Sequence, residues 1–185
     1  MKPLFRGAMV FIGLLAVSAC SINVKKNDSG EDKNVDIKTP FGEIHVDKGA
    51  DVRDTGLPVY AGARIAPDKG KDEKSANVNI SSFGFGLKVV AVKYESDDEP
   101  SKVVAFYKEQ LKRYGSVLEC HKTGQNYSYN HNSDELKCEG DNSGQTVELK
   151  VGNKNNQHIV EIEPSGRGSN FSLVYVRVRG KEDTI

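Results

Sequence analysis

The sequence predicts an α+β fold, in which a curved antiparallel sheet carries one main helix on one face and is preceded by an N-terminal β-hairpin. Short segments of alternating apolar and polar residues recur along the chain and are joined by short turns, which favours antiparallel strands. One stretch, about residues 97–114, instead repeats its apolar residues at helical spacing. Because such a helix must bury its apolar stripe, the two patterns together predict a helix packed on the sheet.

The hairpin is predicted at residues 35–48. Residues 35–38 and 43–46 alternate apolar and polar side chains around a turn in which Pro40 suits the second position and Gly42 the fourth. Two strands alone are only marginally stable in water, so the apolar face of the hairpin needs a cover. We expect the hairpin to dock on the main sheet; the alternative is that it binds a partner or a second copy of the chain.

The main sheet and its helix are predicted within a single α+β domain at residues 49–180, followed by a tail at 181–185. Residues 85–94 have apolar groups on both sides and therefore predict a central strand. Further strands are predicted at residues 77–81, 116–120, 127–130, 135–139, 146–151, 158–163 and 171–178.

The helix is predicted to begin after Ser96 and to end before Gly115. The acidic residues at its start suit the positive end of the helix dipole, and Pro100 is tolerated in the first turn. Val103, Tyr107 and Leu111 recur at helical spacing and should face the sheet.

The first twenty residues have the order of an export signal. Lys2 and Arg6 form a positive end, residues 7–17 are mostly apolar, and small residues precede Cys20. The apolar run is shorter than the roughly 20 residues that a membrane-spanning helix needs. The sequence Val17-Ser18-Ala19-Cys20 resembles the lipobox of bacterial lipoproteins, where a signal peptidase cleaves before a lipid-modified cysteine.

This resemblance implies that residues 1–19 are a signal peptide and that Cys20 becomes the first residue, carrying acyl chains such as palmitate. Because Ser21 and not aspartate follows, it implies the outer membrane of a Gram-negative envelope, facing the periplasm; in a Gram-positive host the protein would lie outside the only membrane. Residues 20–34 are predicted to be a flexible tether, since residues 23–34 contain one apolar residue.

The charge balance argues against nucleic acid as a partner. The whole chain has 26 basic and 26 acidic residues, and loss of the leader, with Lys2 and Arg6, leaves 24 basic against 26 acidic. Nucleic-acid binding normally requires a clustered basic excess, whereas both signs are interleaved here.

The other two cysteines, Cys120 and Cys138, are predicted to form a disulfide, because an exported protein meets an oxidising environment. The nearby His121 and His131 raise the alternative of a zinc site. Cys120 and His121 are adjacent and would point to opposite sides of a strand, so the spacing favours the disulfide and predicts neither metal nor cofactor.

No catalytic motif stands out, and we expect a protein that is not an enzyme. The best candidates for catalysis are Ser81-Ser82, Asp97-Asp98 and residues 165–169, which are better interpreted as a strand end, a helix cap and a turn. His45 and His158 lie in alternating strands and are expected at the surface.

The predicted function is that of a membrane-anchored envelope lipoprotein that acts as a non-catalytic binding module for another envelope protein, peptidoglycan or its own copy. The alternative is a small-molecule or lipid carrier, or a hydrolase, with a pocket between helix and sheet lined by Phe106, Tyr107 and Tyr114. The segments 54–63 and 103–111 resemble uncharacterised bacterial lipoproteins, a similarity that brings no site residues with it.

Overall fold

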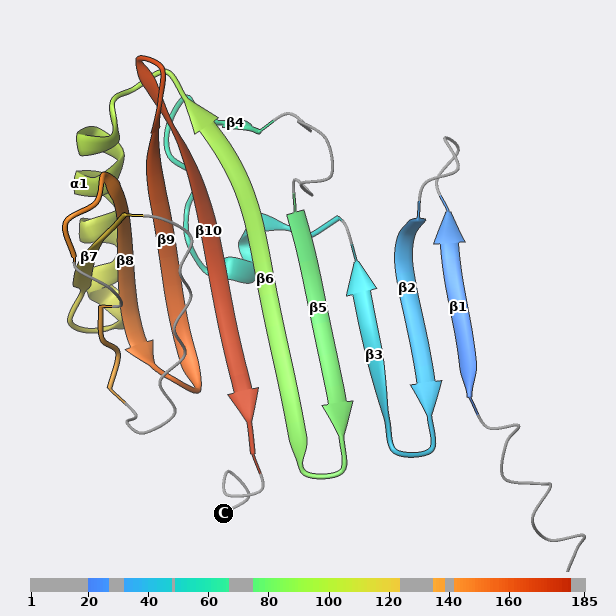
Figure 1. Cartoon of the computed structure of the whole chain (residues 1–185). Coiled ribbons are helices and arrows are strands. Elements are labelled where there is room, and N and C mark those ends of the chain that lie inside the picture. The colour runs from blue at the N-terminus through green and yellow to red at the C-terminus, as the bar shows by residue number, and fades with distance from the viewer. Residues whose placement is uncertain are drawn as a thin grey trace, which may run out of the picture.

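The computed structural model describes residues 20–26, 32–47, 49–66, 75–123, 135–138 and 142–180. Within these residues all strand pairs are antiparallel and form one sheet, in the order β1-β2-β3-β5-β6-β10-β9-β8-β7, with β4 paired to β6 (Figure 1). The strands are β1 (Ser21–Lys26), β2 (Asp32–Thr39), β3 (Gly42–Asp47), β4 (Arg64–Ile65), β5 (Ser75–Ser82), β6 (Phe85–Ser96), β7 (Leu118–Lys122), β8 (Thr146–Asn153), β9 (Asn156–Ser165) and β10 (Gly168–Arg179). The helix α1 (Pro100–Leu111) packs on one face of the C-terminal half, which confirms the predicted α+β fold.

The N-terminal hairpin is present as β2 and β3, and it docks edge to edge. Strand β3 pairs with β5, so that Ile44 lies opposite Ile80 and Val46 opposite Val78. The hairpin therefore widens the main sheet and does not cover it.

The prediction of a flexible tether at residues 20–34 was wrong for the part that the structure describes. Residues Ser21–Lys26 form β1, and β2 begins at Asp32. Ile22 and Val24 lie opposite Ile37 and Val35, and the pairing satisfies backbone groups of β2 that would otherwise form an open edge. The stretch that begins at residue 23 contains one apolar residue and excludes Ile22, so the alternation of Ile22 with Val24 was not recognised.

Most of the remaining strands lie within a few residues of their predicted positions. Residues 135–138, expected in a strand, are not in one. This segment is held by side-chain and carbonyl contacts, because Cys138 is bonded to Cys120 and the Lys137 carbonyl accepts a hydrogen bond from Lys150. The strand predicted at 127–130, the tail at 181–185 and the signal peptide at 1–19 lie outside the described residues.

The helix starts later than predicted. Ser96 Oγ accepts a hydrogen bond from the Asp98 amide, so the acidic residues form a turn before the helix, and Pro100 occupies the first turn. After Leu111 a short 3₁₀ turn, η2 (Lys112–Tyr114), ends at Gly115.

The core lies between α1 and the strands β6, β8, β9 and β10. On the helix Val103, Tyr107 and Leu111 are fully buried, as their spacing predicted. The Tyr107 hydroxyl donates to the Pro58 carbonyl and accepts from the Tyr60 amide, which fixes the loop after the 3₁₀ turn η1 (Val52–Thr55) against the helix. The core thus depends on this loop as well as on the helix.

Candidate functional site

The sheet carries a continuous aliphatic surface on the side opposite α1. We call this surface the aliphatic face; it consists of Ile22, Val24, Val35, Ile37, Ile44, Val46, Val78, Ile80, Leu87, Val89, Val176 and Val178. Successive side chains of a strand point to opposite sides, so these residues share one side of six strands.

Strand register arranges the aliphatic face in two straight rows. Strand by strand from β1 to β10, one row contains only valines, and the other begins with Ile22, Ile37 and Ile44 and ends with Val178. Directly opposed β-branched side chains stabilise neighbouring strands. The rows therefore explain why the first three strands add to the sheet edge.

The side of the sheet that carries the apolar residues differs between the two ends of β6. In β6 the side chains of Val92 and Tyr94 point into the core under α1, whereas Leu87 and Val89 point to the aliphatic face. This reversal explains the apolar residues on both sides of β6, which the sequence indicated as a central strand. Each end of the strand uses a different side of the sheet for its apolar contacts.

The aliphatic face is not covered by the part of the chain that the structure describes. Figure 1 shows neither a helix nor a second sheet over β1, β2, β3 and β5. The exposed fractions are 69% for Ile22, 40% for Val24 and 36% for Ile44, and the other nine side chains of the face are half-buried by their neighbours. Contiguous apolar surface of this kind is typical of an interaction site.

The other side of these strands is polar. A row opposite the valines contains Asn23, Asp36, His45, Asn79, Lys88 and Arg177. His45 Nδ1 lies 2.5 Å from Asp36 Oδ1, and this hydrogen bond lowers the pKa of the Asp36 carboxyl. The single-layer part of the molecule is thus amphipathic across its thickness.

Three phenylalanines stand at the hairpin end of these strands. Phe41 lies in the β2–β3 turn, Phe83 lies in the β5–β6 turn, and Phe85 begins β6; their exposed fractions are 77%, 83% and 45%. A shallow groove of about 420 Å³ separates the two turns and is lined by Pro40, Phe41, Ser82 and Phe83 among others. We call Phe41, Phe83 and Phe85 the aromatic rim.

Cys20, the predicted lipidation site, is exposed and lies at the same end of the sheet. It directly precedes β1, and Ser21 pairs with Lys38 near the end of β2. The sequence indicated the apolar side of the hairpin, which forms part of the aliphatic face, but not its extension over six strands, nor the aromatic rim. Two signals were available, namely the alternation through Ile22 and Val24 and the phenylalanines within glycine-containing turns.

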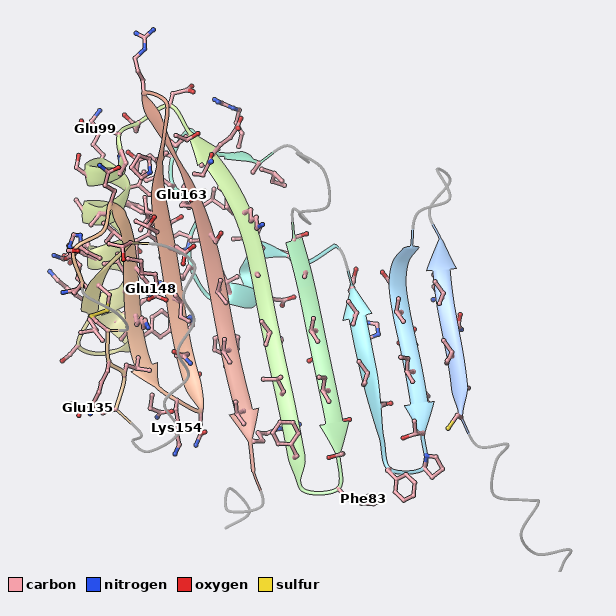
Figure 2. All side chains as sticks on the ribbon, viewed as in Figure 1. Phe83, Glu99, Glu135, Glu148, Lys154 and Glu163 are labelled. Carbon is pink, nitrogen blue, oxygen red and sulfur yellow. A yellow bond between two sulfur atoms is a disulfide. The ribbon has the colours of Figure 1, made fainter. Side chains whose placement is uncertain are left out.

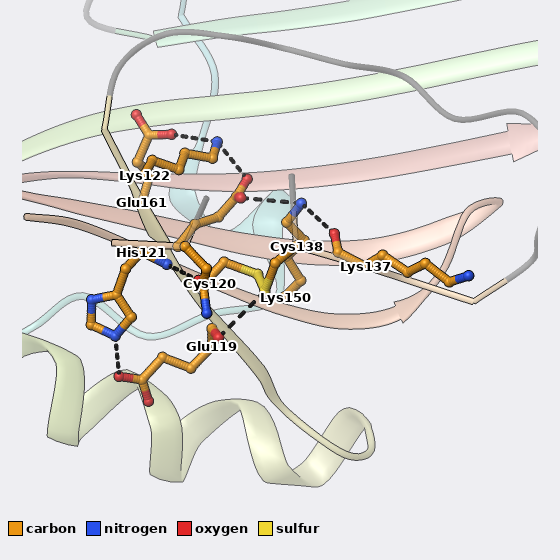
Figure 3. A network of polar contacts seen from close by, with 10 residues as sticks. Glu119, Cys120, His121, Lys122, Lys137, Cys138, Lys150 and Glu161 are labelled. Carbon is orange, nitrogen blue, oxygen red and sulfur yellow. Dashed lines mark hydrogen bonds and ion pairs between the residues drawn. A yellow bond between two sulfur atoms is a disulfide. The ribbon is translucent and has the colours of Figure 1, made fainter. Parts of the chain in front are cut away.

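The predicted disulfide between Cys120 and Cys138 is present, with 5.3 Å between the Cα atoms. Figure 3 shows that it lies beside a buried ion cluster on the side of the sheet opposite α1. Lys122 Nζ lies 2.8 Å from Glu148 and 3.2 Å from Glu161, and Lys150 Nζ lies 3.1 Å from Glu148. The thiols that a zinc site would need are consumed by the disulfide, and the described residues contain no cluster able to hold a metal.

Two of the candidate catalytic segments meet at the far end of the sheet. A polar cavity of about 460 Å³ is lined by Arg64 and Asp97 together with Ser165, Arg167, Gly168 and Ser169. Arg64 binds both carboxylate oxygens of Asp97 at 3.0 Å, and Ser169 donates to the Asp98 carbonyl. Among the described residues around this cavity, no serine hydroxyl is hydrogen-bonded to a side-chain base; Ser96 and Ser169 instead contact the backbone of Asp98.

The remaining candidates lie apart from one another. Ser81 and Ser82 end β5 beside the aromatic rim, and His45 lies on the polar side of the sheet. His158 was expected at the surface but is buried, because it stacks between Tyr114 and Tyr175 and its Nδ1 donates to the Thr55 carbonyl at 2.9 Å.

The alternative of a pocket between helix and sheet named Phe106, Tyr107 and Tyr114. Tyr107 is fully buried, Phe106 packs edge to face on Tyr60 and Tyr107, and Tyr114 stacks on His158 with a ring-centroid distance of 3.9 Å. The three aromatic side chains thus contribute to packing between elements.

Among the described residues, none of the helices has the length and apolar composition required to span a bilayer. The chain matches no protein-family model, and comparisons with curated proteins and with solved structures find no significant match.

Proposed function

We propose that this chain is a lipid-anchored, non-catalytic binding module of the bacterial cell envelope, and that its aliphatic face pairs with the same face of a second copy. The observation that carries the proposal is the uncovered aliphatic face itself, which extends over six strands and reaches the strand that follows Cys20.

The anchor is supported by the lipobox-like sequence and by the position of Cys20. The cysteine is exposed and lies at the outer edge strand of the sheet, where acyl chains meet no packed core. Several acyl chains on one cysteine hold a protein stably on a bilayer, because each buried CH₂ contributes about 0.8 kcal/mol.

A second copy fits the aliphatic face for reasons of symmetry. Two sheets pack face to face at about 10 Å with their strands nearly aligned. A two-fold axis that runs along the strands between the two faces brings like rows together and leaves both Cys20 residues at the same end. Both anchors can then enter one membrane.

The size of the face indicates a weak pair in solution. Across the six strands the face is five strand spacings of about 4.8 Å wide. Along the strands, from the level of Phe85 to that of Ala91, it is three two-residue steps of about 6.8 Å long. The product is a flat footprint of roughly 500 Å² per copy. Specific interfaces bury about 800 Å² per partner. Pairing therefore depends on the high local concentration that a shared membrane provides.

The packing supports this module over a carrier. A carrier requires a cavity beside Phe106 and Tyr107. Tyr107 is instead fully buried, and its hydroxyl is hydrogen-bonded to both the Tyr60 amide and the Pro58 carbonyl. The apolar surface open to a partner lies on the other side of the sheet.

The anchor is tested by mass spectrometry of the protein purified from bacterial membranes. We expect a mature chain that starts at Cys20 and carries acyl chains, and a Cys20→Ser variant that retains residues 1–19. A wild-type chain with its first 19 residues intact, or one without acyl chains, would contradict the anchor.

The pairing is tested by crosslinking in intact cells with a short bismaleimide. Val46 lies on one of the two central strands of the aliphatic face, so a Val46→Cys variant should form crosslinked dimers. The matched control His45→Cys changes the neighbouring residue on the opposite side and should remain monomeric. Equal crosslinking of the two variants, or none in either, would refute face-to-face pairing.

A further inference from the structure

The aromatic rim exposes more apolar surface than its turns require. In the β2–β3 turn Thr39 Oγ1 accepts a hydrogen bond from the Phe41 amide and donates to the Gly42 carbonyl, so the turn is closed without the Phe41 ring. In the β5–β6 turn Gly84 adopts a left-handed φ of 84°, which closes that turn independently of Phe83. Both rings are mostly exposed, and neither takes part in the contacts that close its turn.

Strand register places the aromatic rim level with Cys20. Ser21 pairs with Lys38, Thr39 with Gly42, Gly42 with Ser82, and Ser82 with Phe85. One line across the sheet thus runs from the end that carries Cys20 through both turns to Phe85. Figure 2 shows Phe83 at this end of the sheet and Glu99 at the other.

The anchor leaves almost no distance between the aromatic rim and the membrane. Strand β1 begins at Ser21, the residue that follows Cys20, so no linker separates the acylated residue from the sheet. A single residue spans about 3.4 Å. The hairpin turns must therefore lie at the level of the lipid headgroups if the strands stand upright.

We propose that the aromatic rim inserts into the interface of the bilayer that holds the acyl chains of Cys20, so that the strands stand upright on the membrane. This inference rests on the lipid anchor proposed above. The bilayer is the partner because Phe41 and Phe83 lie in two adjacent turns, level with the anchored residue. The lipid surface is therefore the apolar environment nearest to both rings. Arg179, exposed at the same end, suits the anionic headgroups.

The expected contribution of each ring is substantial. Burial of one phenylalanine side chain changes a partition constant by about tenfold or more. Two rings that insert beside the anchor therefore restrict the tilt of the sheet, whereas the acyl chains alone hold only its corner.

The chain contains no tryptophan, which makes single-tryptophan reporters unambiguous. The acylated full-length protein is purified from bacterial membranes and reconstituted into vesicles of phosphatidylethanolamine and phosphatidylglycerol, with and without brominated acyl chains. Phe83→Trp reports on the aromatic rim. The matched control Arg167→Trp places an exposed tryptophan in the β9–β10 turn at the opposite end.

We expect the Phe83→Trp emission to shift to the blue and to be quenched by brominated lipid, while Arg167→Trp remains unshifted and unquenched. Acylated protein in which both reporters behave as in water overturns the inference and leaves the anchor intact. Equal quenching of both reporters also overturns it, because the sheet then lies flat. If the purified protein carries no acyl chains, the anchor fails and this inference fails with it; circular dichroism confirms that each variant is folded.

Discussion

Lys122 Nζ lies 2.8 Å from Glu148 Oε1 across neighbouring strands, and both side chains are more than nine-tenths buried. Burial alone lowers the pKa of Lys122, but its hydrogen bonds to Glu148 and Glu161 outweigh burial and raise the pKa above the ordinary value for lysine. Lys150 Nζ lies 3.1 Å from the second oxygen of Glu148, so this carboxylate lies between two buried ammonium groups, of which Lys122 also contacts Glu161.

We predict that Glu148→Gln lowers the free energy of unfolding by about 3–5 kcal/mol, because it leaves buried positive charge without its main partner. Urea denaturation measures this loss. The matched control is Glu109→Gln, which breaks an exposed pair with Lys112 and should leave the midpoint within experimental scatter. Equal effects of the two changes would show that the cluster near the disulfide is effectively solvated.

The buried ion cluster illustrates what the sequence could not reveal. Glu148, Lys150 and Glu161 alternate with apolar residues along their strands, a pattern that normally indicates a solvent-facing side. Their burial depends on a segment that includes Lys137 and Cys138 and is folded against the sheet. The alternation of residues within one strand cannot show that a distant segment covers its polar side.

The elements with local signals were predictable. The helix has an apolar stripe through Val103, Tyr107 and Leu111, and the hairpin at residues 35–48 has a clear turn sequence. Strand β1 was missed because its stability comes from pairing with β2 and not from its own composition. The apolar side of the hairpin was predicted, but its continuation into the aliphatic face was missed for a related reason, since it depends on the register of six strands.

Removal of the disulfide should destabilise the protein without altering its fold. The bond joins residues 18 positions apart, and crosslinks that close loops of this size stabilise by about 3 kcal/mol. We therefore predict a loss of this size in a Cys120→Ala and Cys138→Ala double variant. Reduction of the wild type should give the same urea midpoint as the double variant, and a midpoint equal to that of the oxidised protein would contradict the prediction.

The Tyr107 hydroxyl should contribute to stability through the loop that it holds. Tyr107→Phe leaves the Tyr60 amide and the Pro58 carbonyl without their buried partner, so we predict a loss of about 1–3 kcal/mol. The control Tyr114→Phe removes a hydroxyl that binds the Gly56 carbonyl at the surface, where water can replace it. Thermal melts in which the control loses as much as Tyr107→Phe would rule out this role.

Buried His158 should make stability fall as the pH drops below about 6.5, the ordinary pKa of histidine. Burial lowers the pKa of its imidazole; the hydrogen bond to the Thr55 carbonyl opposes this shift, and the nearby Arg113 adds to it. The folded protein therefore binds the His158 proton less readily than the unfolded chain, whose histidine titrates near 6.5. Stability is complete above that value and falls as the pH drops through it, by at most about 1.4 kcal/mol per pH unit for one proton.

The carboxylates titrate in a lower pH range than His158, so its contribution to the pH dependence can be measured separately. Hydrogen bonds lower the pKa values of Asp36, Asp97 and Asp98 below 3.8, so the stability they contribute is present above that value and is lost only in stronger acid. A His158→Asn variant keeps a side-chain amide that can reach the Thr55 carbonyl but does not titrate. Its unfolding free energy should change less between pH 7 and pH 5 than that of the wild type, and parallel pH profiles would mean that His158 is protonated equally in both states.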